Sequence, residues 1–257
     1  MKVVILAGGK GTRLSEETVH KPKPMVEVAN APIITHIMDI YSQYGYNDFV
    51  IALGYKGELI KDYFLNYHYR QNDINVNLDS GSVSILNAHK KKWKVTLIDT
   101  GLDTMTGGRL RRLQPYLNDE PFMLTYGDGL ATVDLAKLKA CHDEHQTIAT
   151  VTAVRPSARF GALNINNHKV TRFKEKSQVD EGWINGGFFV FTPAIFDFID
   201  SDQTILEQEP LEQLTKQEQL TAYKHDDYWR CMDTLRDKEA LCNEWPEQIM
   251  KQQLVNT

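Results

Sequence analysis

The sequence predicts an α/β protein in which helices flank a mixed, mainly parallel β-sheet, and three observations predict this class. The apolar run Lys2–Ala7 has the continuous hydrophobicity of a strand buried on both faces. A helical pattern, a second apolar strand at Asp48–Leu53 and another helical pattern follow it, an order that favours parallel pairing through right-handed crossovers. A later apolar strand, Phe122–Tyr126, ends at a Gly-Asp-Gly turn.

The elements of the first half are bounded by recognisable helix and strand signals. Asn30 can cap the first long helix, Pro32 suits its first turn, and Gly45 closes it after Tyr44. The pattern then predicts a helix at 58–66, strands at 83–86 and 93–99, and a helix at 106–117.

The second half continues the alternation and adds a β-rich insertion. The pattern predicts a helix at 134–145, a strand at 148–154, short strands between Arg159 and Phe191, a helix at 207–216, a strand pair through Cys231-Met232, and a C-terminal helix. We find no repeat, low-complexity tract or linker. One Rossmann-like domain over residues 1–257 is therefore expected, with the insertion as part of it.

Composition excludes several classes of function. The chain has 257 residues, 42% of them hydrophobic and 25% charged, and a net charge of −5. This mildly acidic balance lacks the basic footprint of a nucleic-acid partner, and no apolar run approaches the ~18 residues needed to span a membrane. The start of the chain is too short for a signal-peptide core, so a cytoplasmic location is expected. Its three cysteines fit no zinc spacing and are expected to be reduced.

A glycine-rich loop, Gly8-Gly9-Lys10-Gly11-Thr12-Arg13-Leu14, directly follows the first strand. Such loops let backbone N–H groups approach a polyphosphate. The loop is not a Walker loop, because no Gly-Lys-Ser/Thr follows at the required spacing. It is half a dinucleotide fingerprint, since Leu14 replaces the third glycine and no acidic residue ends the second strand. For Gly-x-Gly alone, a plain turn is the commoner explanation.

The longer string decides between these alternatives. After the loop comes Lys21-Pro22-Lys23-Pro24-Met25, in which Lys23 gives a point charge, while Arg13 in the loop gives a fork-shaped phosphate donor. Together the two runs resemble the sugar-phosphate nucleotidyltransferases, whose hallmark is Gly-Gly-x-Gly-Thr-Arg-Leu followed by Pro-Lys-Pro. The resemblance implies Arg13, Lys23 and Asp128 as catalytic residues. It implies a nucleotide-binding set of Leu6, Ala7, Gly8, Gly9, Lys10, Gly11, Thr12, Arg13, Lys23, Thr104, Arg109 and Asp128.

Two aspartates are candidate ligands of a metal ion. Nucleotidyl transfer needs a cation to neutralise developing charge, and Mg²⁺ prefers one or two carboxylates plus phosphate oxygens. Asp128 lies at the carboxyl end of a predicted strand, where open α/β sheets bind ligands. The resemblance implies Asp128 and Asp233 as the Mg²⁺ ligands. The alternatives are an ordinary turn at Asp128 and a helix N-terminal carboxylate at Asp233.

Other segments resemble the sugar-phosphate pocket of the same family. Phe173-Lys174-Glu175-Lys176 resembles its Glu-Lys-Pro motif, with Ser177 in place of the proline. Without the resemblance this run would be a solvated strand end. The residues implied for the sugar phosphate are Gly161, Glu175, Lys176, Asn185 and Gly186.

The run Asp99–Arg112 resembles the branch of this family that transfers a cytidylyl group to glucose 1-phosphate. This implies CTP and glucose 1-phosphate as substrates and CDP-glucose and pyrophosphate as products. It also implies a role in deoxysugar and O-antigen (lipopolysaccharide) biosynthesis. The resemblance further implies a homo-oligomer, namely a hexamer. An amphipathic helix with a basic exposed face is the alternative for this run. For the whole chain, the alternatives are a uridylyl- or thymidylyltransferase and a non-catalytic sugar-nucleotide-binding relative.

Overall fold

A computed structural model describes residues 1–87, 91–156, 162–166, 168–174 and 182–255. The strands are β1 (Val3–Leu6), β2 (Glu27–Val28), β3 (Ala31–Pro32), β4 (Asp48–Leu53), β5 (Asp73–Val76), β6 (Val83–Leu86), β7 (Lys94–Asp99), β8 (Phe122–Tyr126), β9 (Gly129–Ala131), β10 (Ala149–Val154), β11 (Ala162–Asn166), β12 (Lys169–Lys174), β13 (Ile184–Phe191), β14 (Leu220–His225) and β15 (Trp229–Cys231). The helices are α1 (Ser15–Thr18), α2 (Ile33–Gln43), α3 (Gly57–Leu65), α4 (Tyr67–Gln71), α5 (Thr106–Leu113), α6 (Leu135–His145), α7 (Glu209–Lys216) and α8 (Leu235–Val255).

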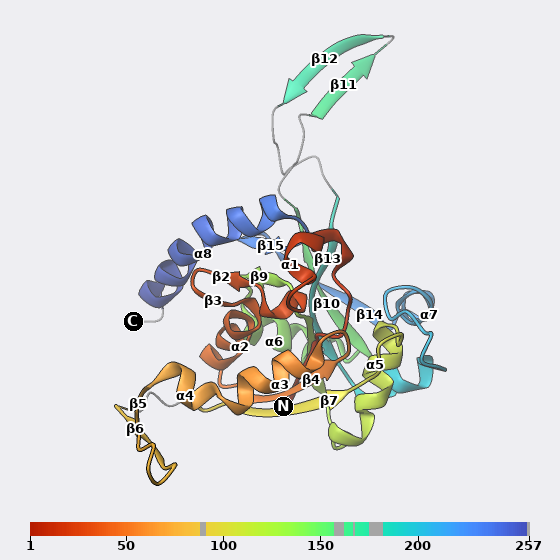
Figure 1. Cartoon of the computed structure of the whole chain (residues 1–257). Coiled ribbons are helices and arrows are strands. Elements are labelled where there is room, and N and C mark those ends of the chain that lie inside the picture. Colours follow the sequence, from red (N-terminus) through yellow and green to blue (C-terminus); the bar gives the residue numbers. More distant parts are fainter. Residues whose placement is uncertain (88–90, 157–161, 167, 175–181, 256–257) are drawn as a thin grey trace.

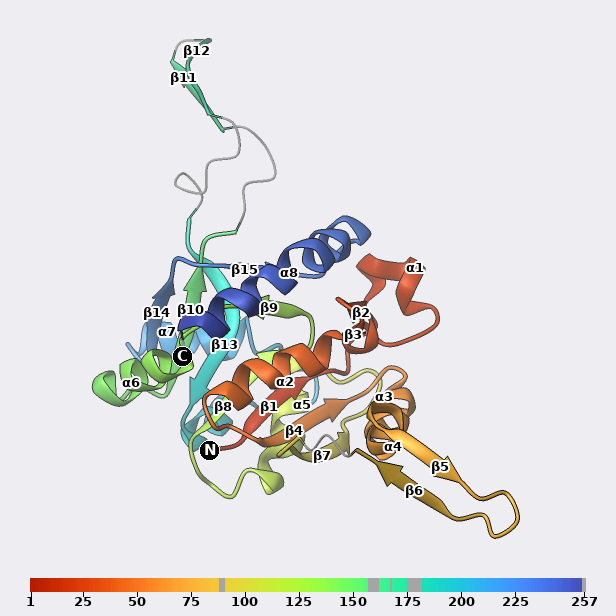
Figure 2. The ribbon, with the colours of Figure 1, turned by 90° about the vertical axis from the view of Figure 1, so that its left-hand side faces the viewer.

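A seven-stranded sheet in the order β14-β10-β13-β8-β1-β4-β7 forms the centre of the molecule (Figures 1 and 2). Only β13 runs antiparallel to its neighbours in this sheet. The predicted fold class, a mainly parallel sheet with helices on both faces, is confirmed. No helix among the described residues is long and apolar enough to cross a bilayer.

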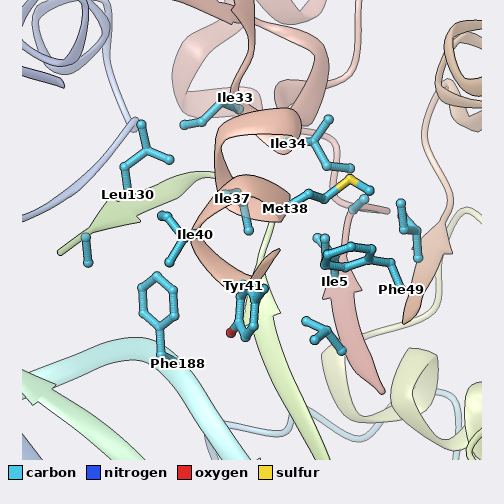
Figure 3. Packing of buried hydrophobic residues seen from close by; sticks show 14 of the residues in the cluster. Ile5, Ile33, Ile34, Ile37, Met38, Ile40, Tyr41, Phe49, Leu130 and Phe188 are labelled. Atoms are coloured by element: carbon cyan, nitrogen blue, oxygen red, sulfur yellow. The ribbon is translucent and has the colours of Figure 1, made fainter. Parts of the chain in front are cut away.

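Alternate residues of β1 face two separate cores, as a continuous apolar strand requires. Val3 and Ile5 pack with α2, α3, α6 and α8, whereas Val4 and Leu6 pack with α5, α7 and the 3-10 segment η5 (Pro193–Phe198). Figure 3 shows the first core, where side chains of α2 lie against Ile5 and Phe188. Burial on both faces fixes β1 in the middle of the sheet.

Three sequence predictions of local structure are wrong. Asn30 does not cap α2. It lies between β2 and β3 with a φ of 67°, and the helix begins at Ile33 after Pro32. The last part of the expected insertion, β13, belongs to the central sheet, whereas β11 and β12 form a separate two-stranded sheet within the described residues. The expected strand pair near Cys231 does not form, because β14 pairs with β10 and β15 with β9.

The carboxyl edge of the sheet gathers the segments of functional interest. The glycine-rich loop follows β1, Thr100 follows β7, and Asp128 follows β8. Because β13 is antiparallel, its first residues, including Asn185, lie at this same edge, paired with the end of β10. Loops from distant parts of the sequence therefore meet there.

Candidate active site

A pocket of about 560 Å³ opens at this edge of the sheet. The residues that line it are Leu6, Ala7, Gly9, Gly11, Arg13, Lys23, Pro24, Thr104, Met105, Thr106, Arg109, Tyr126, Gly127, Asp128, Asn185, Glu207, Trp229, Cys231 and Asp233. Its size is in the range of small-molecule sites.

The ammonium of Lys23 joins two carboxylates at the floor of this pocket. Lys23 Nζ lies 2.6 Å from Asp128 Oδ2 and 2.8 Å from Asp233 Oδ1. The lysine side chain is only 10% exposed. Lys23 is held in the short 3-10 segment Lys23–Met25 between Pro22 and Val26. The cluster therefore combines residues that are 105 and 210 positions apart in the sequence.

Arg13 adds a second positive charge to this cluster. Its Nη1 donates to Asp233 Oδ2 at 2.6 Å, and its side chain is 72% exposed. Asp233 does not cap α8: the N–H groups of Asp233 and Thr234 donate instead to the side chain of Asp237. The carboxylate of Asp233 is thus directed to Lys23 and Arg13.

The ion pairs determine the charge state of the cluster. Burial alone lowers the pKa of the Lys23 ammonium, but Asp128 and Asp233 outweigh burial and raise this pKa above its usual value. Burial alone raises the pKa of the Asp233 carboxyl, but hydrogen bonds and charges from Lys23 and Arg13 leave this pKa below its usual value. Both groups are therefore charged at neutral pH.

The glycine-rich loop presents unused backbone donors next to the cluster. In the described part of the chain, the N–H groups of Gly8, Gly9, Lys10 and Gly11 donate to no protein acceptor. Gly9 has open space where a Cβ would lie. Backbone N–H groups that lack a protein acceptor are available to a ligand of the pocket.

Arg109 supports the loops around the pocket. It is 4% exposed, and its Nη1 lies 3.1 Å from Leu53 O, 2.8 Å from Thr100 Oγ1 and 2.7 Å from Gly101 O. Its Nη2 donates to Leu102 O at 3.2 Å. Burial lowers the pKa of this guanidinium. Arg109 therefore links the end of β4 to the loop after β7.

The same guanidinium explains why the first residue of the glycine-rich loop, Gly8, has no side chain. A Cβ on Gly8 would lie 2.2 Å from Arg109 Nη1, so a side chain at position 8 would displace the arginine. The glycine-rich loop and the segment that contains Arg109 are thus packed against each other directly.

The start of α5 is docked on the segment 202–207. Gly107 N and Gly108 N donate to Thr204 O, and a Cβ on Gly108 would lie 2.4 Å from Asp202 O. Thr106 Oγ1 donates to Glu207 Oε2 at 2.6 Å. The N–H groups of Gly107 and Gly108 are consequently both bound to one protein carbonyl, that of Thr204.

A family model described as nucleotidyl transferase matches residues 2–237 of the chain. The chain belongs to the nucleotidyl transferase family. The matched range includes the glycine-rich loop and the residues Lys23, Asp128 and Asp233 of the charged cluster.

Relatives and solved structures are similar over nearly the whole of this chain. The glucose-1-phosphate cytidylyltransferase of Salmonella typhimurium (strain LT2) is 49% identical over 95% of this chain and 96% of that protein. The mannose-1-phosphate guanylyltransferase catalytic subunit beta of Dictyostelium discoideum is 31% identical over 94% of this chain and 63% of its own length. Among solved structures, an apo UDP-glucose pyrophosphorylase matches with a TM-score of 0.69, 17% identity, and coverage of 96% of this chain and 98% of that one. That last likeness shows the fold alone.

The pocket of this nucleotidyl transferase brings together most of the residues proposed from sequence. Those on its lining are Leu6, Ala7, Gly9, Gly11, Arg13, Lys23, Thr104, Arg109, Asp128, Asn185 and Asp233. Gly8, Lys10, Thr12 and Gly186 lie beside it: Lys10 Nζ is 3.1 Å from Asp103 Oδ1, and Gly186 O accepts from Trp229 Nε1 at 2.7 Å. Gly161, Glu175 and Lys176 lie outside the described residues.

Sequence reasoning missed part of the lining. Tyr126 and Gly127 could have been found, because they end a predicted strand immediately before Asp128. Trp229 could also have been found, because it begins the run Trp229-Arg230-Cys231-Met232-Asp233 that leads to a candidate metal ligand. Glu207 carried no signal: it lies in an ordinary stretch of sequence and reaches the pocket only through the fold.

We expect Arg109→Lys to lower the free energy of unfolding by about 1–3 kcal/mol, because one ammonium cannot serve all the oxygens that the guanidinium binds. Urea denaturation followed by fluorescence measures the loss. Arg236→Lys is the matched control, since Arg236 is exposed. Equal midpoints for the two variants would contradict the supporting role of Arg109.

Proposed function

We propose that this nucleotidyl transferase transfers the cytidylyl group of CTP to α-D-glucose 1-phosphate, giving CDP-glucose and pyrophosphate. The observation that carries the proposal is the Lys23–Asp128–Asp233 cluster beside the free N–H groups of the glycine-rich loop. The 49% identity to the Salmonella cytidylyltransferase over nearly both chains supports the choice of CTP and glucose 1-phosphate. The proposal places the enzyme in the cytoplasm, with a product that serves deoxysugar and O-antigen synthesis.

The chemistry requires positioning and charge neutralisation more than a protein nucleophile. A phosphate oxygen of glucose 1-phosphate attacks the α-phosphorus of CTP, and the bond from that phosphorus to the bridging oxygen of the β-phosphate breaks. The attacking phosphate is already ionised, so no general base is needed. Lys23 and Arg13 stabilise the negative charge that develops on the transferred and leaving phosphates. The N–H groups of Gly8–Gly11 hold the polyphosphate.

Asp128 and Asp233 fit the ligand chemistry of Mg²⁺. Their carboxylates converge on one cation, the Lys23 ammonium, from separate segments. Among the described residues no group of three or more His, Cys, Asp and Glu side chains could hold a metal. Two carboxylates leave the remaining positions to phosphate oxygens and water, as Mg²⁺ sites with nucleotides require. When bound, the cation would neutralise phosphate charge.

We expect Asp128→Asn to reduce turnover by at least about 100-fold, the scale of removing a major electrostatic contributor. Its binding of Mn²⁺ in the presence of CTP, followed by electron paramagnetic resonance, should weaken in parallel. Asp226→Asn, at an exposed position away from the pocket, is the control. Near-normal turnover of Asp128→Asn would contradict the role of Asp128 in holding the metal.

The choice of base is tested by pyrophosphate release from each of CTP, UTP, dTTP and GTP with saturating glucose 1-phosphate and Mg²⁺. A site built around the amino group of cytosine has a protein acceptor for that group, and this acceptor is left without a hydrogen-bond donor when uracil binds. We therefore expect CTP to exceed UTP by at least about tenfold in kcat/KM. Equal or better use of UTP or dTTP would refute the cytidylyl assignment and favour the uridylyl or thymidylyl alternative. No turnover with any triphosphate would favour a non-catalytic relative.

We also propose that the enzyme is a homo-oligomer, with a hexamer as the state implied by resemblance, and that the hairpin of β5 and β6 takes part in the contact between copies. The two strands pair only with each other among the described residues and project from the body (Figure 2). Register places Ile74 opposite Ile85 and Val76 opposite Val83, so all four share one face. They are between 37% and 46% exposed. A lone hairpin with an uncovered apolar face is marginal in water, and a second copy offers the same face.

Replacing Ile74 by Asp should lower the molar mass of the assembly measured by light scattering, because a charge on the shared apolar face opposes its burial. Asn75→Asp places the same charge on the other face of the hairpin and is the control. An unchanged mass for Ile74→Asp, or a monomeric wild type, would contradict this contact.

A further inference from the structure

One carboxylate in the pocket is held by two hydroxyl groups and by no cation. Glu207 Oε2 accepts from Thr106 Oγ1 at 2.6 Å, and Glu207 Oε1 accepts from the phenol of Tyr126. Thr106 Oγ1 in turn accepts from the backbone N–H of Leu206 at 2.9 Å. In the part of the chain that the structure describes, Glu207 forms no ion pair. Among these described residues its position is therefore fixed by hydrogen bonds, and no cation compensates its charge.

The hydrogen-bonded row continues along the pocket wall. Asn185 Nδ2 approaches Tyr126 Oη at 3.4 Å, and Asn185 Oδ1 accepts from Gly187 N at 2.8 Å. Asn185, Tyr126 and Glu207 all line the pocket. They come from β13, the end of β8 and the segment before α7, whereas the glycine-rich loop follows β1. The pocket thus has, besides the glycine-rich loop and the Lys23 cluster, a row of amide, phenol and carboxylate groups.

We propose that Glu207 is a specificity-determining residue that accepts hydroxyl groups of the sugar substrate, with Tyr126 and Thr106 as the residues that position its carboxylate. This inference rests on the proposed function and adds to it a contact to the hexose ring. Each oxygen of an ionised carboxylate has further acceptor capacity after one hydrogen bond, so Glu207 can receive hydroxyl donors from a ligand.

Charge and chemistry favour a hexose over the other parts of the substrates. An uncompensated carboxylate repels phosphate groups, so the ligand portion beside Glu207 has to be neutral and rich in donors. A hexose offers several hydroxyls in a row, each of which donates and accepts, and thereby matches the row of Asn185, Tyr126 and Glu207. The nucleoside of CTP offers the amino group of cytosine and the two hydroxyls of ribose, and a contact to either of them becomes an outcome of the test.

The phenol of Tyr126 is suited to hold the carboxylate in place. The hydroxyl of Tyr126 donates a hydrogen bond to Glu207 Oε1 and so fixes one of the two carboxylate oxygens, while Thr106 fixes the other. Thr106 is the first residue of α5, whose glycines dock on the segment that leads to Glu207. Both contacts orient a side chain that would otherwise rotate freely.

The test is steady-state kinetics on Glu207→Gln, Tyr126→Phe and the control Glu212→Gln, an exposed carboxylate in α7. We expect Glu207→Gln to raise KM for glucose 1-phosphate by at least about tenfold, the loss of one charge-assisted hydrogen bond, with KM for CTP changed less than about twofold. Tyr126→Phe should raise the same KM by a smaller factor, because the carboxylate remains but loses one support. Glu212→Gln should match the wild type.

Monodeoxy analogues of glucose 1-phosphate locate the contact. If Glu207 accepts a given hydroxyl, the analogue that lacks this hydroxyl has a much lower kcat/KM than glucose 1-phosphate with the wild type. With Glu207→Gln, the same analogue and glucose 1-phosphate then differ little in kcat/KM. Every other analogue lowers kcat/KM by the same factor with both enzymes. A rise in KM for CTP alone would overturn the proposal and assign Glu207 to the nucleoside of CTP. Unchanged kinetics, or a loss of stability in urea with unchanged KM, would leave Glu207 a purely structural residue. An inactive wild type would instead refute the proposed function itself.

Discussion

The ammonium of Lys23, placed between the carboxylates of Asp128 and Asp233, is the interaction on which the pocket depends. Two carboxylates that converge in a half-buried site repel each other unless a cation lies between them. Lys23 supplies that cation and so ties the segment after the glycine-rich loop to the ends of β8 and β15. The resulting cluster is charged but nearly balanced, and it lies beside unused N–H groups of the loop. A polyphosphate with its divalent cation can enter such a site by exchanging partners within it, without exposing an unpaired charge.

A second constraint holds the wall of the pocket. The guanidinium of Arg109 donates hydrogen bonds to the carbonyl groups of Leu53, Gly101 and Leu102 and packs against Gly8. The first turn of α5, next to it, is docked on the segment 202–207. Together these contacts give a rigid frame in which Glu207 is fixed by hydroxyl groups rather than by a cation. The pocket therefore contains a cluster of two cations and two carboxylates and, on other segments, a carboxylate held by hydroxyl groups.

Much of this arrangement could be predicted from sequence, because some signals are local. The apolar run around Val3–Leu6 and the strand that ends before Asp128 predicted the sheet and its carboxyl edge correctly. The motif with Arg13 and Lys23 predicted residues that line the pocket, and their role in phosphate binding stays a proposal. Asn30 was misread because a good capping residue also suits a turn with positive φ. Glu207 and the pairing of β13 depend on contacts between distant segments, which no local pattern encodes. The extent of the domain, and the roles of Gly161, Glu175 and Lys176, remain proposals.

The most direct test of the account is a crystal structure of the protein grown with CTP and Mg²⁺ and without sugar phosphate. The account predicts the triphosphate on the N–H groups of Gly8–Gly11, the cation on Asp128 and Asp233, and Lys23 bound to a phosphate oxygen. A triphosphate bound elsewhere, or one bound at the loop while both carboxylates keep only Lys23 as their partner, would contradict it.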